Sequence, residues 1–389
     1  MIANETSKWD REQRLDEVIA DYLKALHAGQ APDPQQWLAD YPELAAELTR
    51  RLEGKLPHAW EDGLPEFPTN EKGMATRISS GKVINALAGR LPELVGGSAD
   101  LAPSNKTWID GSPPFTVATP EGRNLHFGVR EHAMGSIVNG MAVFGGLIPY
   151  AGTFLVFSDY MRPAIRLSAL SHYPSIWVFT HDSIGLGEDG PTHQPVEHLA
   201  ALRAIPELVV LRPGDANEVR EAWKIAIERR FGPTALALSR QDVPTLDRNI
   251  YAPADGLAHG AYVLAEIGDG DPEIILMASG SELSLIIKAG ELLAAEGVNV
   301  RLVSFPSWEL FEKEDPAYRQ LVLPDEITAR LAVEAGVSLG WERWVGDRGI
   351  VIGVDRFGSS APYKVVYEQY GLTVQIILAK ARALLAVRS

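Results

Sequence analysis

The sequence predicts an α/β protein with two three-layer α/β/α domains that have mostly parallel sheets, preceded by a short helical N-terminal segment. Apolar runs long enough for one buried strand, such as residues 175–180, alternate with longer amphipathic stretches from about residue 75 onward. This alternation is typical of βα units and of parallel sheets. A break rich in proline and aspartate at residues 242–253 divides the alternating region into two parts.

Length and composition agree with this class and exclude several others. The 389 residues are enough for two or three domains, each with its own core. The absence of cysteine excludes disulfides, thiol nucleophiles and cysteine-ligated metals. The formal charge of 36 − 51 = −15 disfavours nucleic acid as a partner, because its phosphates would repel the protein. No apolar stretch of about 18 residues and no signal-peptide core is visible, so we expect a cytoplasmic protein without a membrane span.

The start of the chain has its own pattern. Apolar residues recur on one helical face over residues 15–26, and a second helical stripe covers residues 37–52. Glycine and proline at residues 29–34 separate the two stripes. We therefore expect residues 1–56 to form a helical segment that is too small for an independent domain. Residues 57–76, with three prolines and two glycines, are expected to be a linker.

The two α/β domains are expected at residues 77–247 and 248–389. For the first domain the pattern predicts strands over residues 124–127, 147–150, 175–180, 208–211 and 234–239, and helices over residues 78–90, 131–144, 157–171, 194–204 and 216–229. For the second it predicts strands over residues 274–278, 298–305, 329–334 and 349–353, and helices over residues 281–296 and 373–387.

A loop after the strand at residues 175–180 concentrates titratable side chains. His181, Asp182, Glu188, Asp189 and His193 lie within thirteen residues. The loop contains a literal G-x-G-x-x-G, but its two acidic residues would repel a dinucleotide pyrophosphate. A metal site and a solvated loop are both possible. A catalytic or sugar-binding loop fits better, since open α/β sheets bind ligands at the carboxyl ends of their strands.

Two further groups of residues allow both a structural and a functional interpretation. Glu131 stands where a strand leads into a helix, and such an acid often only complements the helix dipole. Phe154, Phe157 and Tyr160 are spaced i, i+3, i+6, which predicts one face of a helix. Such a stripe is usually core, but it could also be the wall of a pocket for a planar ring.

Several contiguous segments carry a resemblance to a known family, namely residues 96–105 (GGSADLAPSN), 126–134, 181–195 and 239–241. From about residue 56 to its end, the chain resembles transketolase. The resemblance implies thiamine diphosphate as cofactor, and a pyrimidine-binding domain followed by a smaller C-terminal domain that builds the dimer. Transketolases also have a first domain that binds the cofactor's diphosphate through a divalent metal, Mg²⁺ or Ca²⁺. That domain is expected to be missing here, with the helical segment, which weakly resembles an acidic helical leader, in its place.

The resemblance also implies roles for individual residues. Glu131 would protonate the aminopyrimidine ring, a task that needs a carboxylate at a rigid strand–helix junction. The ring would pack against Phe154, Phe157 and Tyr160. The sugar phosphate would be bound by Arg77, Ser104, His181, Asp189, His193 and Arg240. His193 would also assist proton transfer. The two arginines and His181 allow an acidic protein to bind an anion. No residue of this chain is expected to ligate a metal.

The implied function is transfer of a two-carbon ketol unit between sugar phosphates. The chain would be the pyrimidine-side half, a homodimer that needs a separate diphosphate-binding subunit. Three alternatives remain open: a short self-contained enzyme, a non-catalytic binding or regulatory module, and a beta-type subunit of a 2-oxoacid dehydrogenase. The sugar-phosphate set, with Arg77, Ser104, Asp189 and Arg240, counts against the last of these.

Overall fold

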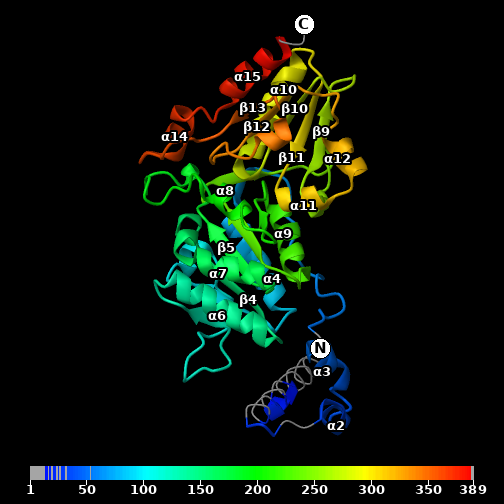
Figure 1. Cartoon of the computed structure of the whole chain (residues 1–389), viewed down its shortest axis with the longest axis vertical. Helices are drawn as coiled ribbons and strands as arrows, with labels where there is room; N and C mark the ends of the chain where they lie inside the picture. The colour runs from blue at the N-terminus through cyan, green and yellow to red at the C-terminus, as the bar shows by residue number, and fades with distance from the viewer. Residues whose placement is uncertain are drawn as a thin grey trace. The chain divides into compact units, whose positions relative to one another are not determined.

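The computed structural model describes residues 14–15, 17–18, 21–22, 25, 28–30, 33–52 and 54–386. The chain divides into two compact units, Met1–Trp60 and Glu61–Ser389 (Figure 1). Among the described residues, no helix has both the length and the apolar character needed to cross a membrane.

The first unit is helical where it is described. The expected helix over residues 37–52 is two helices, α2 (Pro34–Asp40) and α3 (Ala45–Leu52), because the chain turns between them. The expected helix over residues 15–26 lies partly outside the described residues, and those that are described are helical. The two stripes meet in a small apolar core, as their periodicity predicts, made of Leu15, Val18, Trp37, Leu44 and Leu48.

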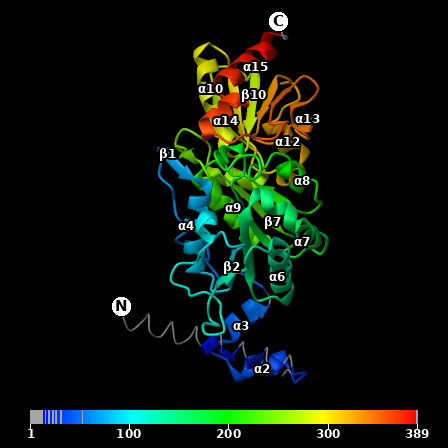
Figure 2. The ribbon, with the colours of Figure 1, turned by 90° about the vertical axis from the view of Figure 1, so that its left-hand side faces the viewer.

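The second unit begins with a six-stranded sheet, all parallel, in the order β3-β2-β4-β5-β7-β6. Its strands are β2 (Leu94–Ser98), β3 (Asn124–His126), β4 (Ile148–Phe154), β5 (Ile176–Thr180), β6 (Val209–Leu211) and β7 (Thr234–Leu238). Its helices are α4 (Thr76–Ala88), α5 (Ala102–Asn105), α6 (Glu131–Phe144), α7 (Ser158–Leu170), α8 (His198–Arg203) and α9 (Ala216–Glu228). Helices α6 and α7 pack together on one face, and α4 and α9 on the other (Figure 2).

A second sheet has five strands in the order β13-β12-β10-β11-β9, and only β9 is antiparallel to its neighbour. Its strands are β9 (Tyr262–Ile267), β10 (Ile274–Ala278), β11 (Val300–Ser304), β12 (Arg330–Val333) and β13 (Ile350–Ile352). Its helices are α10 (Leu283–Ala295), α11 (Trp308–Lys313), α12 (Pro316–Val322), α13 (Glu342–Val345), α14 (Tyr363–Gln369) and α15 (Val374–Ala386). The predicted fold class, α/β with mostly parallel sheets, is confirmed.

The linker expected at residues 57–76 needs correction at its end. Strand β1 (Asn70–Ala75) pairs antiparallel with β8 (Asp242–Thr245), so the segment before α4 is bound to the segment after β7. Its sequence, NEKGMA, has no apolar alternation that would predict a strand. The pairing with a distant segment forms this strand, and it brings the start of α4 to the end of β7.

The two sheets are joined by a buried ionic cluster around Arg212, which is fully buried. Its Nε donates to Asp182 Oδ2 at 2.9 Å, and its Nη1 donates to Glu282 Oε2 at 2.5 Å. Asp182 follows β5 of the first sheet, whereas Glu282 precedes α10 of the second. Because Asp182 directly follows the predicted site residue His181, this cluster also holds the backbone next to that residue.

Candidate functional site

The predicted site residues gather at the carboxyl ends of the strands of the six-stranded sheet. Phe154 is the last residue of β4, His181 follows β5 directly, and Arg240 stands two residues after β7. These three strands are neighbours, and the register aligns Phe154 with Thr180. Glu131 follows β3 and opens α6. Their side chains therefore share the edge at which open α/β sheets bind ligands.

Arg77 reaches this edge through the start of α4. The backbone N–H of Thr76 donates to Ser239 Oγ at 3.0 Å, immediately after β7. This contact fixes Arg77 beside the end of that strand. Its Nη1 donates to the carbonyl oxygen of Ser104 at 2.8 Å and lies 3.4 Å from His181 Nε2. Ser104 thus holds the guanidinium through its backbone, and within the described residues its hydroxyl forms no hydrogen bond.

His181 is held on its edge and on its face. Its Nδ1 lies 2.9 Å from Thr180 Oγ1, which accepts a hydrogen bond from Asn105 Nδ2 at 2.7 Å. The ring of Phe154 stacks on the imidazole with 3.7 Å between the centroids. The backbone of His181 has φ 58°, a conformation uncommon for residues other than glycine. The ring is therefore fixed with Nε2 toward Arg77.

The charge balance of this group suits an anion. Burial, followed by the positive charges of Arg77 and Arg240, lowers the pKa of His181 to about 3, so the imidazole is neutral at pH 7. Burial and the charge of Arg240 also lower the pKa of Arg77, although Asp242 opposes this effect. Two arginines therefore lie close enough to repel each other, and an anion between them would relieve that repulsion.

The lowered pKa of His181 predicts a pH-dependent stability. The pKa of His181 is about 3 in the folded protein against a reference value of 6.5, so the unfolded chain binds more protons between these values. Unfolding free energy from urea titrations should fall by about 2 kcal/mol more between pH 7 and pH 5 in the wild type than in His181→Asn. Asparagine tolerates the left-handed backbone conformation. Equal pH dependence in both proteins would contradict the assignment.

The aromatic side chains form a row, but they do not share one helical face as the spacing predicted. Phe154 ends β4, Phe157 lies in the 3₁₀ turn η1 (Leu155–Phe157), and Tyr160 lies in α7. The rings of Phe154 and Phe157 are nearly parallel, with 5.7 Å between centroids and 8° between planes. Tyr160 continues the row and is 65% exposed. The row thus leads from the buried imidazole of His181 to the surface, as the wall of a ring pocket would.

Glu131 is a buried carboxylate with a weak local partner. It is 7% exposed, and its Oε1 accepts one long hydrogen bond, 3.4 Å, from Thr153 Oγ1. Thr153 precedes Phe154, so the carboxylate lies beside the beginning of the aromatic row. The predicted position at the first turn of a helix is confirmed. A buried carboxylate with one long hydrogen bond retains the capacity to bind a further donor.

The loop after β5 places His193 near the aromatic row and leaves Asp189 exposed. His193 is half-buried, and its ring stands edge-on to Phe157 at 5.5 Å between centroids. In the described part of the chain, no contact ties the Asp189 side chain to the other predicted residues. The helix expected at residues 194–204 begins only at His198, because the chain turns around Gly190 first.

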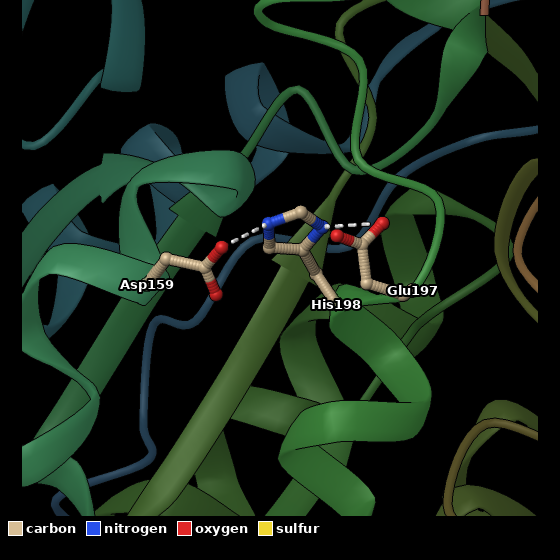
Figure 3. A group of neighbouring side chains, drawn as sticks. All are labelled: Asp159, Glu197 and His198. Atoms are coloured by element: carbon tan, nitrogen blue, oxygen red, sulfur yellow. Dashed lines mark hydrogen bonds and ion pairs between the residues drawn. The ribbon is translucent and has the colours of Figure 1, made fainter. Parts of the chain in front are cut away.

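The loop residues do not form a metal cluster. Within the described residues, the side chains close enough to share a cation are Asp159, Glu197 and His198 (Figure 3). His198 Nε2 lies 3.1 Å from Asp159 Oδ2, and its Nδ1 lies 3.7 Å from Glu197 Oε2. Figure 3 shows the two carboxylates at opposite edges of the imidazole. A buried histidine that joins α7 to the start of α8 through its contact with Asp159 accounts for this arrangement.

Three residues that support the site were not singled out from the sequence. Asn105 and Thr180 orient His181, and Thr76 docks α4 onto β7. Asn105 lies within residues 96–105, one of the segments that carry the family resemblance. The sequence gives no sign that its amide bonds to Thr180, 75 positions away. Only the assembled sheet brings these small polar side chains together.

Family models match most of the chain. Residues 72–245 match the model described as "Transketolase, pyrimidine binding domain", and residues 260–373 match "Transketolase-like TK C-terminal domain". A transketolase of Geobacillus stearothermophilus is 52% identical over 377 residues, which is 95% of this chain and 56% of that protein. Because 95% of the chain is covered, the alignment extends into the N-terminal helical segment.

Solved structures agree with the sequence matches. The transketolase of Pichia stipitis in complex with sedoheptulose 7-phosphate has a TM-score of 0.85 and 41% identity, covering 91% of this chain and 52% of that one. A split-gene transketolase, solved as an inactive β4 tetramer, has a TM-score of 0.66 and 27% identity, covering 82% of this chain and 100% of that one. The chain thus spans a little over half the length of the curated relative and all of the split-gene chain.

Proposed function

Because this chain belongs to the transketolase-like family, we propose that it is the pyrimidine-side half of a thiamine diphosphate-dependent transketolase. It would take part in the transfer of a two-carbon ketol unit between sugar phosphates. The observation that carries the proposal is the meeting, at one sheet edge, of the aromatic row, the arginine–histidine cluster and the buried Glu131. The diphosphate and its Mg²⁺ or Ca²⁺ would be held by a separate subunit.

The residues present fit the ring end of the cofactor. The aminopyrimidine is planar and has a basic ring nitrogen. The row of Phe154, Phe157 and Tyr160 offers flat rings to stack on, and Glu131 offers a buried carboxylate with spare acceptor capacity. When bound, thiamine diphosphate supplies carbanion stabilisation that side chains lack. Glu131 would hold a proton at the ring nitrogen, which is general acid–base work by a positioned group.

The cationic cluster would bind the phosphate of the sugar. Arg77 and Arg240 would supply the positive charge for the phosphate. The imidazole of His181 is neutral at pH 7, so it would contribute a hydrogen bond and no charge. His193, whose ring stands edge-on to Phe157, would hydrogen-bond the reacting part of the ketose. Asp189, exposed on the same loop, would bind a sugar hydroxyl.

Replacing Arg240 by leucine should discriminate between donor substrates. A charge-assisted hydrogen bond contributes about 1.5–3 kcal/mol, so the KM for a ketose phosphate should rise about ten- to hundredfold. The KM for hydroxypyruvate, which has no phosphate, should stay within about twofold. Arg348→Leu, at another exposed arginine, is the matched control and should change neither value. Equal changes for both donors in Arg240→Leu would rule out phosphate binding by this side chain.

A second copy of the chain is the proposed partner for one apolar surface. Helices α6 and α7 pack together, and several of their large apolar side chains are exposed, namely Ile137, Val143, Phe144, Leu167 and Leu170. Contiguous exposed apolar side chains are typical of protein interfaces. Sedimentation of the chain should give a dimer, and Leu170→Asp should shift it toward the monomer.

Cofactor binding tests the proposal directly. Calorimetry with thiamine diphosphate and Mg²⁺ should give weak or no binding to this chain alone, because the proposal assigns the diphosphate ligands to the separate subunit. Tight binding should appear when the chain is mixed with a polypeptide that corresponds to the uncovered part of the Geobacillus stearothermophilus transketolase. No binding in the mixture, although the two polypeptides associate, would refute the proposal.

A further inference from the structure

The loop that carries Asp189 and His193 contacts the C-terminal domain through the buried amide side chain of Gln194 and through a hydrogen bond from Ser360 to the backbone of Glu188. We propose that Gln194 is a positioning residue that locks this loop in place, so that the C-terminal domain sets the location of the substrate-binding side chains. The inference rests on the proposed function for the roles of Asp189 and His193. The fastening itself rests only on contacts in the structure.

The amide of Gln194 joins three backbone carbonyls. Its Nε2 lies 3.3 Å from the Ile184 oxygen, 2.9 Å from the Gly187 oxygen and 3.0 Å from the Ser359 oxygen. The first two belong to the loop itself, and the third belongs to the segment before α14, 165 residues further along the chain. Gln194 is buried, with 3% exposure. Removing this donor would break the link between the loop and the Ser359 carbonyl, whereas the Ile184 and Gly187 carbonyls keep the backbone N–H groups of Gly187 and Gly190. The loop would keep its own turns but lose a hydrogen bond that holds it against the segment before α14.

Glycines permit the close approach of the two segments. A Cβ on Gly358 would lie 1.7 Å from Gln194 Oε1, and a Cβ on Gly190 would lie 3.1 Å from Ser360 Cβ. Beside the amide, Ser360 Oγ donates to the carbonyl oxygen of Glu188 at 2.5 Å. The loop and the segment before α14 are therefore in close contact around the Gln194 amide.

The fastened loop in turn fixes the predicted substrate ligands. The N–H groups of His193 and Gln194 both donate to the Gly190 carbonyl, at 3.0 and 3.1 Å. His193 therefore moves with Gln194, and its edge-on position against Phe157 depends on where the amide is held. Asp189 has no side-chain contact of its own in the described part of the chain, so its location is set by the loop backbone.

Hydrogen exchange of the full chain tests the fastening without any need for activity. In Gln194→Glu, a carboxylate would face the three carbonyls and repel them. The amides of Gly187, Gly190 and His193 should then exchange about 10- to 100-fold faster than in the wild type. Gly358→Ala should have the same effect, because the new methyl group displaces the Gln194 side chain without altering it.

The matched control is Asn217→Asp, another buried amide-to-acid change away from the loop. Asn217 Nδ2 donates to the Phe67 carbonyl at 2.9 Å, so this variant also loses a buried hydrogen bond to backbone. It should leave exchange in residues 184–194 unchanged. Unchanged exchange there in both Gln194→Glu and Gly358→Ala would overturn the proposal, and so would equally fast exchange in the control.

Kinetics of the reconstituted enzyme separate positioning from a general structural role. Gln194→Glu should raise the KM for a sugar phosphate about tenfold, while the Kd of thiamine diphosphate stays unchanged, because the aromatic row is not on the loop. A proportional loss of cofactor affinity would instead indicate general damage and count against the proposal. If the wild-type mixture has no turnover, the proposed function fails, and hydrogen exchange still decides the role of Gln194.

Discussion

Replacing Glu131 by glutamine is expected to lower kcat for ketol transfer by about 10²–10⁴-fold in the reconstituted enzyme, the range typical for loss of a positioned acid–base group. Glutamine keeps the shape of the side chain but cannot exchange a proton with the ring nitrogen of the cofactor. Folding should be nearly unaffected, because Glu131 accepts only one long hydrogen bond, from Thr153 at 3.4 Å. Steady-state kinetics and a thermal melt of the same preparation measure both quantities.

The control for this variant is Glu221→Gln, at a second buried carboxylate. Glu221 lies on α9, which covers the opposite face of the sheet, and it pairs with Arg220 and Lys224. Its replacement should leave kcat within about twofold of the wild type. If Glu131→Gln retains full activity, or if both variants lose activity equally, Glu131 is not the acid–base group.

Replacing Arg212 by methionine is expected to destabilise the protein by about 3–5 kcal/mol, the cost of breaking a buried ion pair from one side. Burial alone would lower the pKa of Arg212, but Glu282 and Asp182 raise it well above its ordinary value, so the guanidinium is charged in the folded protein. Methionine would leave these two carboxylates buried without their partner. Urea unfolding followed by fluorescence and circular dichroism measures the loss.

The matched control is Arg382→Met, which breaks an exposed pair with Glu296. Both members of that pair are solvated, so the unfolding midpoint should hardly change. The destabilisation in Arg212→Met should be accompanied by faster hydrogen exchange at Asp182 and at His181, which precedes it. An unfolding free energy equal to that of the wild type would contradict the assignment of the cluster as the joint between the two sheets.

The regular part of the fold could be predicted from local sequence because local forces set it. The buried run at residues 175–180 and the small-residue helix at residues 131–144 appear as β5 and α6 with closely similar bounds. Strand β1 could not be predicted, since its sequence has neither alternation nor a buried run, and its pairing with β8 arises from tertiary structure. The spacing of Phe154, Phe157 and Tyr160 wrongly predicted one helical face. These residues lie at a strand end, in a 3₁₀ turn and in a helix, and only their separation in sequence matches a helical repeat.

A site residue could be predicted from the sequence alone where it directly follows a predicted buried strand. His181 follows the buried strand β5 directly, at the edge where open α/β sheets bind ligands, whereas Arg240 was predicted only from the resemblance to transketolase. The supporting contacts could not be inferred in this way. Arg212 meets Glu282 across 70 positions, and Gln194 meets Ser359 across 165. No periodicity links such residues, and only the docking of the two sheets creates their contacts.

Ketol transfer by the reconstituted protein is the most direct measurement. Hydroxypyruvate and an aldose phosphate are supplied with thiamine diphosphate and Mg²⁺ to this chain, to the polypeptide for the uncovered part of the Geobacillus stearothermophilus transketolase, and to their mixture. We expect turnover only in the mixture, and its loss when the chain carries Glu131→Gln. Turnover by this chain alone, or a mixture that associates and binds cofactor yet transfers no ketol unit, would contradict the assignment of this chain as the pyrimidine-side half.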